Sequence, residues 1–249
     1  MKILFISLGC DKNLADSEEM LGLLTGSGHE IVDSEEEAEA IVINTCCFIH
    51  DAKEESVNTI LEMAEYKKTG KCKALIVTGC MAQRYKEEIT QEIPEVDAVL
   101  GTTSYGDIVK ALNEAQAGHV FQEFRDINEL REDSGRRVLT TGGHFGYLKI
   151  AEGCDKHCTY CIIPSLRGKF RSVPEERLLA QAEYMASQGV KELILVAQET
   201  TVYGTDLYGK KTLHILLKKL CQIKGIRWIR VLYCYPEEIY DELIQVMKE

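Results

Sequence analysis

The sequence predicts an α/β protein in which parallel β-sheets are covered by helices. Short runs rich in Ile, Val and Leu alternate with longer polar segments that have helical spacing. This alternation is typical of parallel sheets, because each strand needs a long crossover connection to reach the next. The chain has 249 residues, of which 45% are hydrophobic and 28% are charged, and this composition indicates a folded protein of one or two domains.

The first module is predicted to contain four strands and four helices. The strands are expected at 3–8, 40–44, 74–78 and 98–100. The helices are expected at 15–25, 53–68, 85–93 and 105–115. Asp16 or Ser17 near the first helix and the Glu-rich start of the second favour helix N-termini, where acidic and hydroxyl groups meet free N–H groups.

A polar interval at 119–143 interrupts this alternation and predicts a linker between an N-terminal domain at 1–118 and a second domain at 144–249. In the second domain, strands are expected at 145–150, 192–197 and 228–233. Helices are expected at 175–187 and 213–223, and another begins near Pro236. Three such units leave a sheet edge unpaired, so we expect the chain to be a fragment of a longer protein.

Charge and hydropathy exclude several classes of function. Residues 1–120 carry 10 basic and 22 acidic residues, a net charge of −12, while 121–249 carry 19 and 18, a net charge of +1. A nucleic-acid coat is therefore not expected of the first half, because phosphate binding needs clustered positive charge. No apolar run reaches the roughly 18 residues of a membrane span, and the short run 3–8 does not resemble an export signal. We therefore expect a cytoplasmic protein without a membrane partner, whose ten cysteines bind metal or act in redox chemistry.

Three cysteines, Cys154, Cys158 and Cys161, form a C-x3-C-x2-C motif directly after a predicted strand. We call them the loop cysteines. Three thiolates in one short loop can hold three corners of a 4Fe-4S cluster and leave one iron open to bind another molecule. A zinc site completed by His157 is the alternative, although three Cys and one His would then be packed unusually tightly.

Three further cysteines, Cys10, Cys46 and Cys80, each follow a predicted strand of the first module. We call them the strand-end cysteines. Ligands bind at the carboxyl ends of strands in open α/β sheets, so these thiols are expected to converge into a second metal site. The alternative is that they are small buried hydrophobes. The remaining Cys47, Cys72, Cys221 and Cys234 are expected to be structural or free.

The motifs together resemble the radical S-adenosylmethionine methylthiotransferases. The C-x3-C-x2-C motif with Tyr160 before its third cysteine is similar to that of radical S-adenosylmethionine enzymes in general. The methylthiotransferase branch is indicated by Ser-Leu-Gly-Cys-Asp-Lys-Asn at 7–13, Asn-Thr-Cys at 44–46, Thr-Gly-Cys at 78–80 and Glu-Gly-Cys at 152–154. Within that branch, Gly-Cys-Asp-Lys-Asn at 9–13 and the segment 162–172 resemble the enzymes that modify protein twelve of the small ribosomal subunit.

The resemblance implies two 4Fe-4S clusters and S-adenosylmethionine as cofactors. The loop cysteines would hold the cluster that cleaves S-adenosylmethionine to a 5′-deoxyadenosyl radical, which removes hydrogen from the substrate carbon. The strand-end cysteines would hold the cluster that presents the methylated sulfur. The product would be a methylthio group on the β-carbon of an aspartate in that ribosomal protein. Tyr160 would contact the cofactor, and an electron donor such as flavodoxin or ferredoxin would be a partner. Gln198 and Thr200 follow the strand expected at 192–197, where a parallel barrel places ligand groups, so they are also expected to contact the cofactor, with a polar loop as the alternative.

The resemblance also implies that the second domain is the N-terminal half of a radical S-adenosylmethionine (β/α) barrel. The family continues this barrel to six strands and adds a small β-barrel domain. Cys47 and Val173 stand where the family often has Gly and Arg, but neither is an expected ligand. Two alternatives stay open at this point: a transfer-RNA adenosine methylthiotransferase and a non-catalytic iron-sulfur electron carrier.

A basic cluster follows the loop cysteines and consists of Arg167, Lys169 and Arg171. A solvated charged face is the expected explanation for it, and contact with an anionic cofactor or ribosomal RNA is the alternative. Tyr233 and Tyr235 end the third strand of the second module and are expected either to pack in the core or to line a site.

Overall fold

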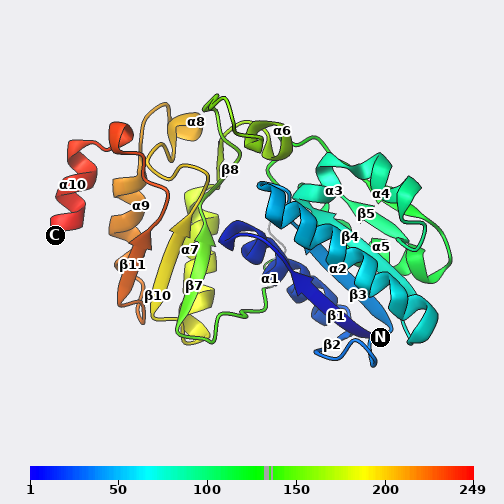
Figure 1. The fold of residues 1–249 in the computed structure, drawn as a ribbon. Coiled ribbons are helices and arrows are strands. Elements are labelled where there is room, and N and C mark those ends of the chain that lie inside the picture. Colours follow the sequence, from blue (N-terminus) through cyan, green and yellow to red (C-terminus); the bar gives the residue numbers. More distant parts are fainter. Residues whose placement is uncertain (132–134, 136) are drawn as a thin grey trace. The chain divides into compact units, whose positions relative to one another are not determined.

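The protein divides into two compact units, both of which are α/β (Figure 1). The computed structural model describes residues 1–131, 135 and 137–249. Unit 1 comprises Met1–Val138 and Thr159–Arg167, and unit 2 comprises Leu139–Cys158 and Gly168–Glu249. The predicted fold class is confirmed in both units.

Unit 1 contains a parallel sheet of six strands in the order β2-β1-β3-β4-β5-β6 (Figure 1). The strands are β1 (Lys2–Ser7), β2 (Glu30–Val32), β3 (Ala40–Thr45), β4 (Ala74–Gly79), β5 (Ala98–Leu100) and β6 (Phe121–Glu123). In the central strands β3 and β4 every residue is buried. Burial on both faces explains the uninterrupted apolar runs that mark these two strands in the sequence.

Helices cover both faces of this sheet. They are α1 (Asp11–Gly26), α2 (His50–Thr69), α3 (Cys80–Arg84), α4 (Lys86–Glu92), α5 (Ile108–Gln116) and α6 (Ile163–Arg167), with a 3₁₀ turn η1 (Tyr105–Asp107) before α5. Alternate residues of a strand point to opposite faces, so Ile41 and Ile43 pack in one core while Ala40 and Val42 pack in the other. The first core includes side chains of α2, α3 and α6, and the second includes side chains of α1 and α5.

Two strands of this sheet, β2 and β6, were not expected from the sequence. Each has only three residues and lies at an edge of the sheet, where half-exposed positions weaken the apolar pattern. The helix expected at 85–93 is confirmed as α4, whereas the short helix α3 before it was not expected, and the backbone of Tyr85 leaves the helical region between the two.

The interval expected to be a linker, 119–143, contributes structure to unit 1. It contains β6, and its later residues bond to α1: Arg137 pairs with Glu18, and the backbone N–H of Val138 donates to the Glu18 carbonyl. The polar composition of this interval therefore reflects ion pairs with a helix as well as solvent exposure.

Unit 2 contains a parallel sheet of three strands in the order β11-β10-β7. The strands are β7 (Phe145–Lys149), β10 (Glu192–Val196) and β11 (Trp228–Val231). A two-stranded antiparallel ribbon, β8 (Ala151–Glu152) and β9 (Arg171–Ser172), flanks the segment that carries the loop cysteines. The helices are α7 (Glu175–Ser187), α8 (Thr205–Tyr208), α9 (Leu213–Leu220) and α10 (Asp241–Lys248), with a 3₁₀ turn η2 (Pro236–Glu238).

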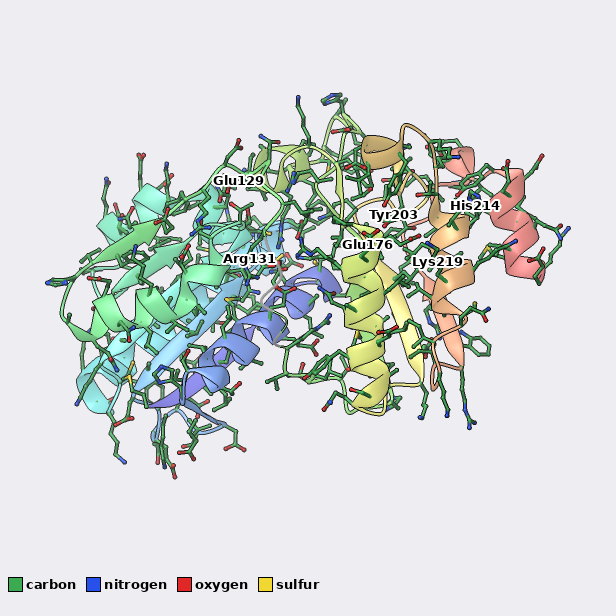
Figure 2. The ribbon with its side chains drawn as sticks, turned by 180° about the vertical axis from the view of Figure 1, so that it is seen from behind. Glu129, Arg131, Glu176, Tyr203, His214 and Lys219 are labelled. Atoms are coloured by element: carbon green, nitrogen blue, oxygen red, sulfur yellow. The ribbon has the colours of Figure 1, made fainter. Side chains whose placement is uncertain are left out.

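The interior of unit 2 is closed by Tyr203, which is labelled in Figure 2. Its ring is fully buried and its hydroxyl donates to the Val173 carbonyl oxygen at 2.8 Å. Burial raises the pKa of this phenol, so it stays protonated as a donor.

Among the described residues, no helix is both long and apolar enough to cross a membrane.

Candidate metal centres

The strand-end cysteines follow three strands that are neighbours in the sheet of unit 1. Cys10 precedes α1 in the loop after β1, Cys46 follows β3 directly, and Cys80 follows β4 and begins α3. Because β1, β3 and β4 are adjacent and parallel, their carboxyl ends lie at one edge of the sheet. The topology thus brings the three loops to the same edge, as the strand-end pattern predicts.

The side chain of Asn13 joins these three loops. Its Nδ2 donates to the Leu8 carbonyl at 3.1 Å and to the Thr45 carbonyl at 3.0 Å, which are the loops that lead to Cys10 and Cys46. Its Oδ1 lies 3.8 Å from the Cys80 Sγ. Asn13 is fully buried, so each of these bonds replaces one that it would make with water.

Close backbone contacts reinforce this arrangement. Gly9 has φ +93°, and a Cβ atom at this position would lie 2.8 Å from the Cys46 Cβ and 3.1 Å from its Sγ. Gly79 has φ +94°, and its Cβ would lie 2.5 Å from the Thr45 carbonyl oxygen. Glycine is required at both positions, because any larger residue would be strained and would displace the neighbouring cysteine loop.

Cys46 is held by Ser56 of α2. The Ser56 hydroxyl accepts from the Cys46 backbone N–H at 3.0 Å and donates to the Cys46 carbonyl at 2.8 Å, and it is fully buried. The neighbouring Cys47 is also buried, and its thiol donates to the Cys80 carbonyl at 3.3 Å. Burial raises the pKa of the Cys47 thiol to about 11, which keeps it a neutral donor at the edge of the strand-end site.

Arg167, at the end of α6, lies against the same site. Its guanidinium donates to the Asp16 carboxylate at 2.8 Å and to the Asn13 Oδ1 at 2.5 Å, and the side chain is 3% exposed. Burial raises the pKa of the Cys80 thiol, and the positive charge of Arg167 beside it acts in the opposite direction. The expectation that 167, 169 and 171 form a solvated face is therefore wrong for Arg167, because an acidic partner on α1 makes its burial possible.

The loop cysteines lie in a segment that begins after the β8 strand. The Cys154 backbone N–H donates to the Gly168 carbonyl at 3.1 Å, and its Sγ accepts from the Lys156 backbone N–H at 3.4 Å. Gly153 has φ +71°, and its Cβ would lie 2.5 Å from the Gly168 carbonyl oxygen. Cys154 is buried, while Cys158 and Cys161 are partly exposed, so solvent reaches two of the three loop cysteines.

Lys156 ties this segment to the ends of β10 and β11 in unit 2. Its Nζ lies 3.4 Å from Glu199, 3.1 Å from Glu237 and 3.4 Å from Glu238, and 4.3 Å from the centre of the Tyr235 ring. Burial acts to lower the pKa of Lys156, but these carboxylates outweigh it and raise that pKa. Lys156 is consequently a permanent cation between two cysteines of the motif.

The other residues that the sequence predicted near the cofactor differ in their surroundings. Thr200 is fully buried, and its hydroxyl donates to the Leu232 carbonyl at 2.7 Å, so it joins the exits of β10 and β11. Gln198 is partly exposed at the end of β10, and Tyr160 is 85% exposed. Tyr233 has φ +59°, the one positive value for a non-glycine residue in the described part of the chain. The cofactor contacts of Tyr160, Gln198 and Thr200 stay predictions.

Both cysteine sets offer thiol donors, which iron-sulfur clusters and zinc can both use. Within the described residues, no three His, Cys, Asp or Glu side chains are grouped as a single ion would need them. A zinc ion draws its ligands to about 2.3 Å from one point. A 4Fe-4S cluster places four irons between its thiolates, which therefore stand further apart, and it takes cysteine in preference to other ligands. Each set supplies three free cysteines, the ligand type that such a cluster takes.

Comparison with known proteins defines the class to which these sites belong. Residues 148–249 match the Radical SAM superfamily, and residues 2–101 match the uncharacterized protein family UPF0004. Residues 148–249, which include all three loop cysteines, therefore carry the motif of a radical S-adenosylmethionine protein, and residues 2–101 carry a family domain of their own.

Relatives that match along the whole of this chain identify the family more closely. The chain is 66% identical over 248 residues to the ribosomal protein uS12 methylthiotransferase RimO of Lachnoclostridium phytofermentans, an alignment covering 100% of this chain and 56% of that protein. It is 54% identical over 245 residues to the protein of the same name from Clostridium botulinum strain Eklund 17B. That alignment covers 98% of this chain and 55% of that protein. The chain belongs to the radical S-adenosylmethionine methylthiotransferase family. It spans about half the length of the curated relatives it matches.

A solved structure shares the fold at low sequence identity. It is that of TsrM from Kitasatospora setae, a radical S-adenosylmethionine methyltransferase, with cobalamin and a 4Fe-4S cluster bound. The TM-score is 0.61 at 11% identity, and the match covers 99% of this chain and 56% of that one. At this identity the likeness concerns the fold alone.

Several residues that shape the candidate sites were not singled out in the sequence. Asn13 lies within a motif that was quoted for the family, but its three contacts depend on loops that are distant in sequence. Ser56 and Glu199 have no local signal, because a buried serine or glutamate looks like any other polar residue of a helix or loop. Arg167 was singled out as part of a basic cluster, but its burial was not expected. The acidic residues in the first turns of α1, among them Asp16, are the signal that could have indicated a buried partner.

Proposed function

We propose that the full-length protein adds a methylthio group to the β-carbon of an aspartate in the small-subunit ribosomal protein uS12, using S-adenosylmethionine and two 4Fe-4S clusters. One observation carries this proposal: a single chain contains both the loop cysteines and a second set of cysteines at adjacent strand ends. Cleavage of S-adenosylmethionine needs only the loop set. The strand-end set is then available for the sulfur that is transferred.

The loop cysteines Cys154, Cys158 and Cys161 would hold the cluster at which S-adenosylmethionine binds. Such a cluster supplies an electron and an iron with an open coordination position. The protein positions the loop: Lys156 holds it to the acidic groups of unit 2, and the Gly168 carbonyl fixes Cys154. Tyr160, Gln198 and Thr200 are proposed to bind and orient the cofactor at the carboxyl ends of the strands, where such barrels place ligands.

The strand-end cysteines Cys10, Cys46 and Cys80 would hold the second cluster. Here the protein keeps three loops in register through Asn13 and Ser56. Cys46 and Cys80 are buried, while Cys10 is exposed and leaves one side of the site open to solvent. In the overall reaction one C–H bond of the aspartate is replaced by a C–S bond, and the hydrogen leaves with 5′-deoxyadenosine.

The remaining assignments follow from this proposal. The division into domains at 1–118 and 144–249 with a connecting interval at 119–143 separates the two cluster sites along the chain. The enzyme would work in the cytoplasm, where ribosomes are assembled, and would receive electrons from a small carrier such as flavodoxin or ferredoxin.

A product assay on the full-length protein tests the proposal. The anaerobically reconstituted protein is incubated with S-adenosylmethionine, a reductant and either uS12 or transfer RNA, and the products are analysed by mass spectrometry. We expect 5′-deoxyadenosine together with a methylthio group on an aspartate of uS12. A variant carrying Cys10→Ala, Cys46→Ala and Cys80→Ala should still release 5′-deoxyadenosine but leave uS12 unmodified.

Two outcomes would overturn it. A methylthio group on adenosine of transfer RNA, with uS12 unchanged, would identify the nucleic-acid branch of the family. Bound iron without any cleavage of S-adenosylmethionine would identify an electron carrier.

A further inference from the structure

The guanidinium of Arg167 lies beside one of the strand-end cysteines, Cys80. It is buried at the end of α6, and its donors go to Asp16 and Asn13, both on α1. The Asn13 Oδ1 that accepts from Arg167 at 2.5 Å lies 3.8 Å from the Cys80 Sγ, so the guanidinium is separated from that thiol by one oxygen atom. Thus a residue six positions after the last loop cysteine bonds to the helix that follows Cys10 and lies beside the thiol that follows β4.

Two other arginines provide a comparison within unit 1. Arg137 pairs with the buried Glu18 of α1 at 2.7 Å, and Arg131, labelled in Figure 2, pairs with Glu19 at 2.5 Å. Like Arg167, each neutralises an acidic residue of α1 at a side-chain exposure of 15% or less. Arg167 bonds to Asn13, whose Oδ1 lies next to the Cys80 Sγ, whereas Arg131 lies against Tyr105 and Glu19, and Arg137 lies against Glu18.

Stability alone does not account for the position of Arg167. The free energy cost of desolvating two charges offsets much of the attraction in a buried ion pair, and an apolar pair of similar volume often gives equal stability. The fork of the guanidinium, however, can satisfy a carboxylate and an amide oxygen while its charge faces a sulfur atom. A lysine could supply the charge but could not hold both oxygens in one plane.

We propose that Arg167 is a positioning residue of the strand-end site, which orients Asn13 and places a fixed positive charge beside Cys80. This deepens the proposed function and rests on it, because it concerns the cluster that those cysteines would hold. Three thiolates and a cluster carry net negative charge, which increases on reduction. A buried cation beside them therefore stabilises the reduced state and raises the reduction potential.

The effect of charge predicts that replacing Arg167 and replacing Asp16, the two partners of one ion pair, shift the reduction potential in opposite directions. Arg167→Met removes the cation and leaves Asp16 beside the site, so reduction becomes harder. Asp16→Asn keeps the shape and removes the anion, so reduction becomes easier. We expect about a tenfold change in the reduction equilibrium in each direction, which for a one-electron couple is about 59 mV. A purely structural role would not give shifts of opposite sign.

The test uses the full-length protein in which Cys154, Cys158 and Cys161 are replaced by Ala, so that iron can bind only at the strand-end cysteines. Arg167→Met, Arg167→Lys, Asp16→Asn and Arg137→Met are made in this background and reconstituted anaerobically. Iron and sulfide are counted, and the midpoint potential is measured by titration followed by electron paramagnetic resonance. Arg137→Met is the matched control, since Arg137 is also buried but pairs with Glu18 of α1, whereas Arg167 pairs with Asp16 and Asn13.

The expected pattern is a lowered potential in Arg167→Met, a raised potential in Asp16→Asn, and a potential near that of the parent in Arg167→Lys and Arg137→Met. Equal potentials in all variants would overturn the inference, as would shifts of the same sign in Arg167→Met and Asp16→Asn. Should Arg167→Met fail to fold, the sign of the Asp16→Asn shift still decides. A parent that binds no iron would contradict the proposed function itself, which separates the two failures.

Discussion

The two cysteine sets differ in how the chain brings them together. The loop cysteines lie within eight consecutive residues, so local sequence alone keeps them close. The strand-end cysteines are spread from position 10 to position 80 and meet only because β1, β3 and β4 are neighbours in one sheet. The loop site thus depends on local sequence, whereas the strand-end site depends on the order of strands in the sheet.

The surroundings of the two sets differ in the same way. The strand-end loops are fixed by buried, mostly neutral hydrogen bonds from Asn13 and Ser56. The loop segment is fixed in unit 2 by Lys156, which is partly exposed and pairs with two exposed or half-exposed glutamates. Changes to packing should therefore damage the first site most, while changes of salt and pH should affect the second.

Glycine substitutions give the largest expected separation between the two sites. In Gly79→Ala the new Cβ would meet the Thr45 backbone at 2.5 Å, and in Gly153→Ala it would meet the Gly168 carbonyl at 2.5 Å, both at positive φ. We expect each to lower the free energy of unfolding by roughly 3 kcal/mol, near the upper end of backbone strain. Each should also abolish about four irons, Gly79→Ala from the strand-end site and Gly153→Ala from the loop site.

Gly118→Ala is the control for these variants, because Gly118 has φ +78° but no atom within 4 Å of a new Cβ. It should cost only about 1–2 kcal/mol of conformational strain and leave both iron contents unchanged. Loss of iron from both sites in either glycine variant would contradict the independence of the sites. Urea unfolding and iron analysis are the measurements.

A smaller effect is expected for Ser56→Ala, which removes the hydroxyl that both accepts from and donates to the backbone of Cys46. The buried Cys46 N–H and carbonyl lose their partner, at a cost of about 1–3 kcal/mol. Because Cys46 is then free to turn, iron at the strand-end site should fall severalfold while iron at the loop site is retained. Ser165→Ala, which removes an exposed hydroxyl bonded to the Ile162 carbonyl, should change neither.

The smallest expected effect concerns pH. The pKa of Glu237 is held below its ordinary value of 4.5 by a hydrogen bond from its own backbone N–H and then by one from Lys156, and the pKa of Glu238 is lowered by hydrogen bonds from Lys211 and then from Lys156. Groups with a lowered folded-state pKa contribute stability above their unfolded pKa and lose it as pH falls through the folded pKa. The difference in unfolding free energy between the iron-free protein and its Lys156→Met variant should therefore be present at neutral pH and disappear in acid.

Urea unfolding of the iron-free protein at about pH 7 and about pH 3 measures this difference. Lys68→Met, which removes exposed ion pairs to Glu65 and Glu95 in unit 1, is the matched control: reconstituted in a parallel sample, it should retain the iron of the parent at the loop site. A difference for Lys156→Met that grows toward acid would show that the carboxylates do not hold the loop.

Much of this arrangement could be predicted from the sequence. The buried strands β3 and β4 and the loop cysteines have strong local patterns, because apolar runs and close cysteine spacing are visible within a few residues. The edge strands β2 and β6 could not be predicted, because three half-exposed residues form a strand only through their neighbour in the sheet. Arg167 was misjudged for a similar reason: its burial depends on Asp16, which lies 151 positions away.

The central claim is that one chain holds two independent clusters, and iron counting tests it most directly. The full-length protein is compared after anaerobic reconstitution with a Cys154→Ala/Cys158→Ala/Cys161→Ala variant and a Cys10→Ala/Cys46→Ala/Cys80→Ala variant. The account predicts about eight irons with matching acid-labile sulfide, falling to about four in each variant. About four irons in the parent, lost only when the loop cysteines are replaced, would contradict it.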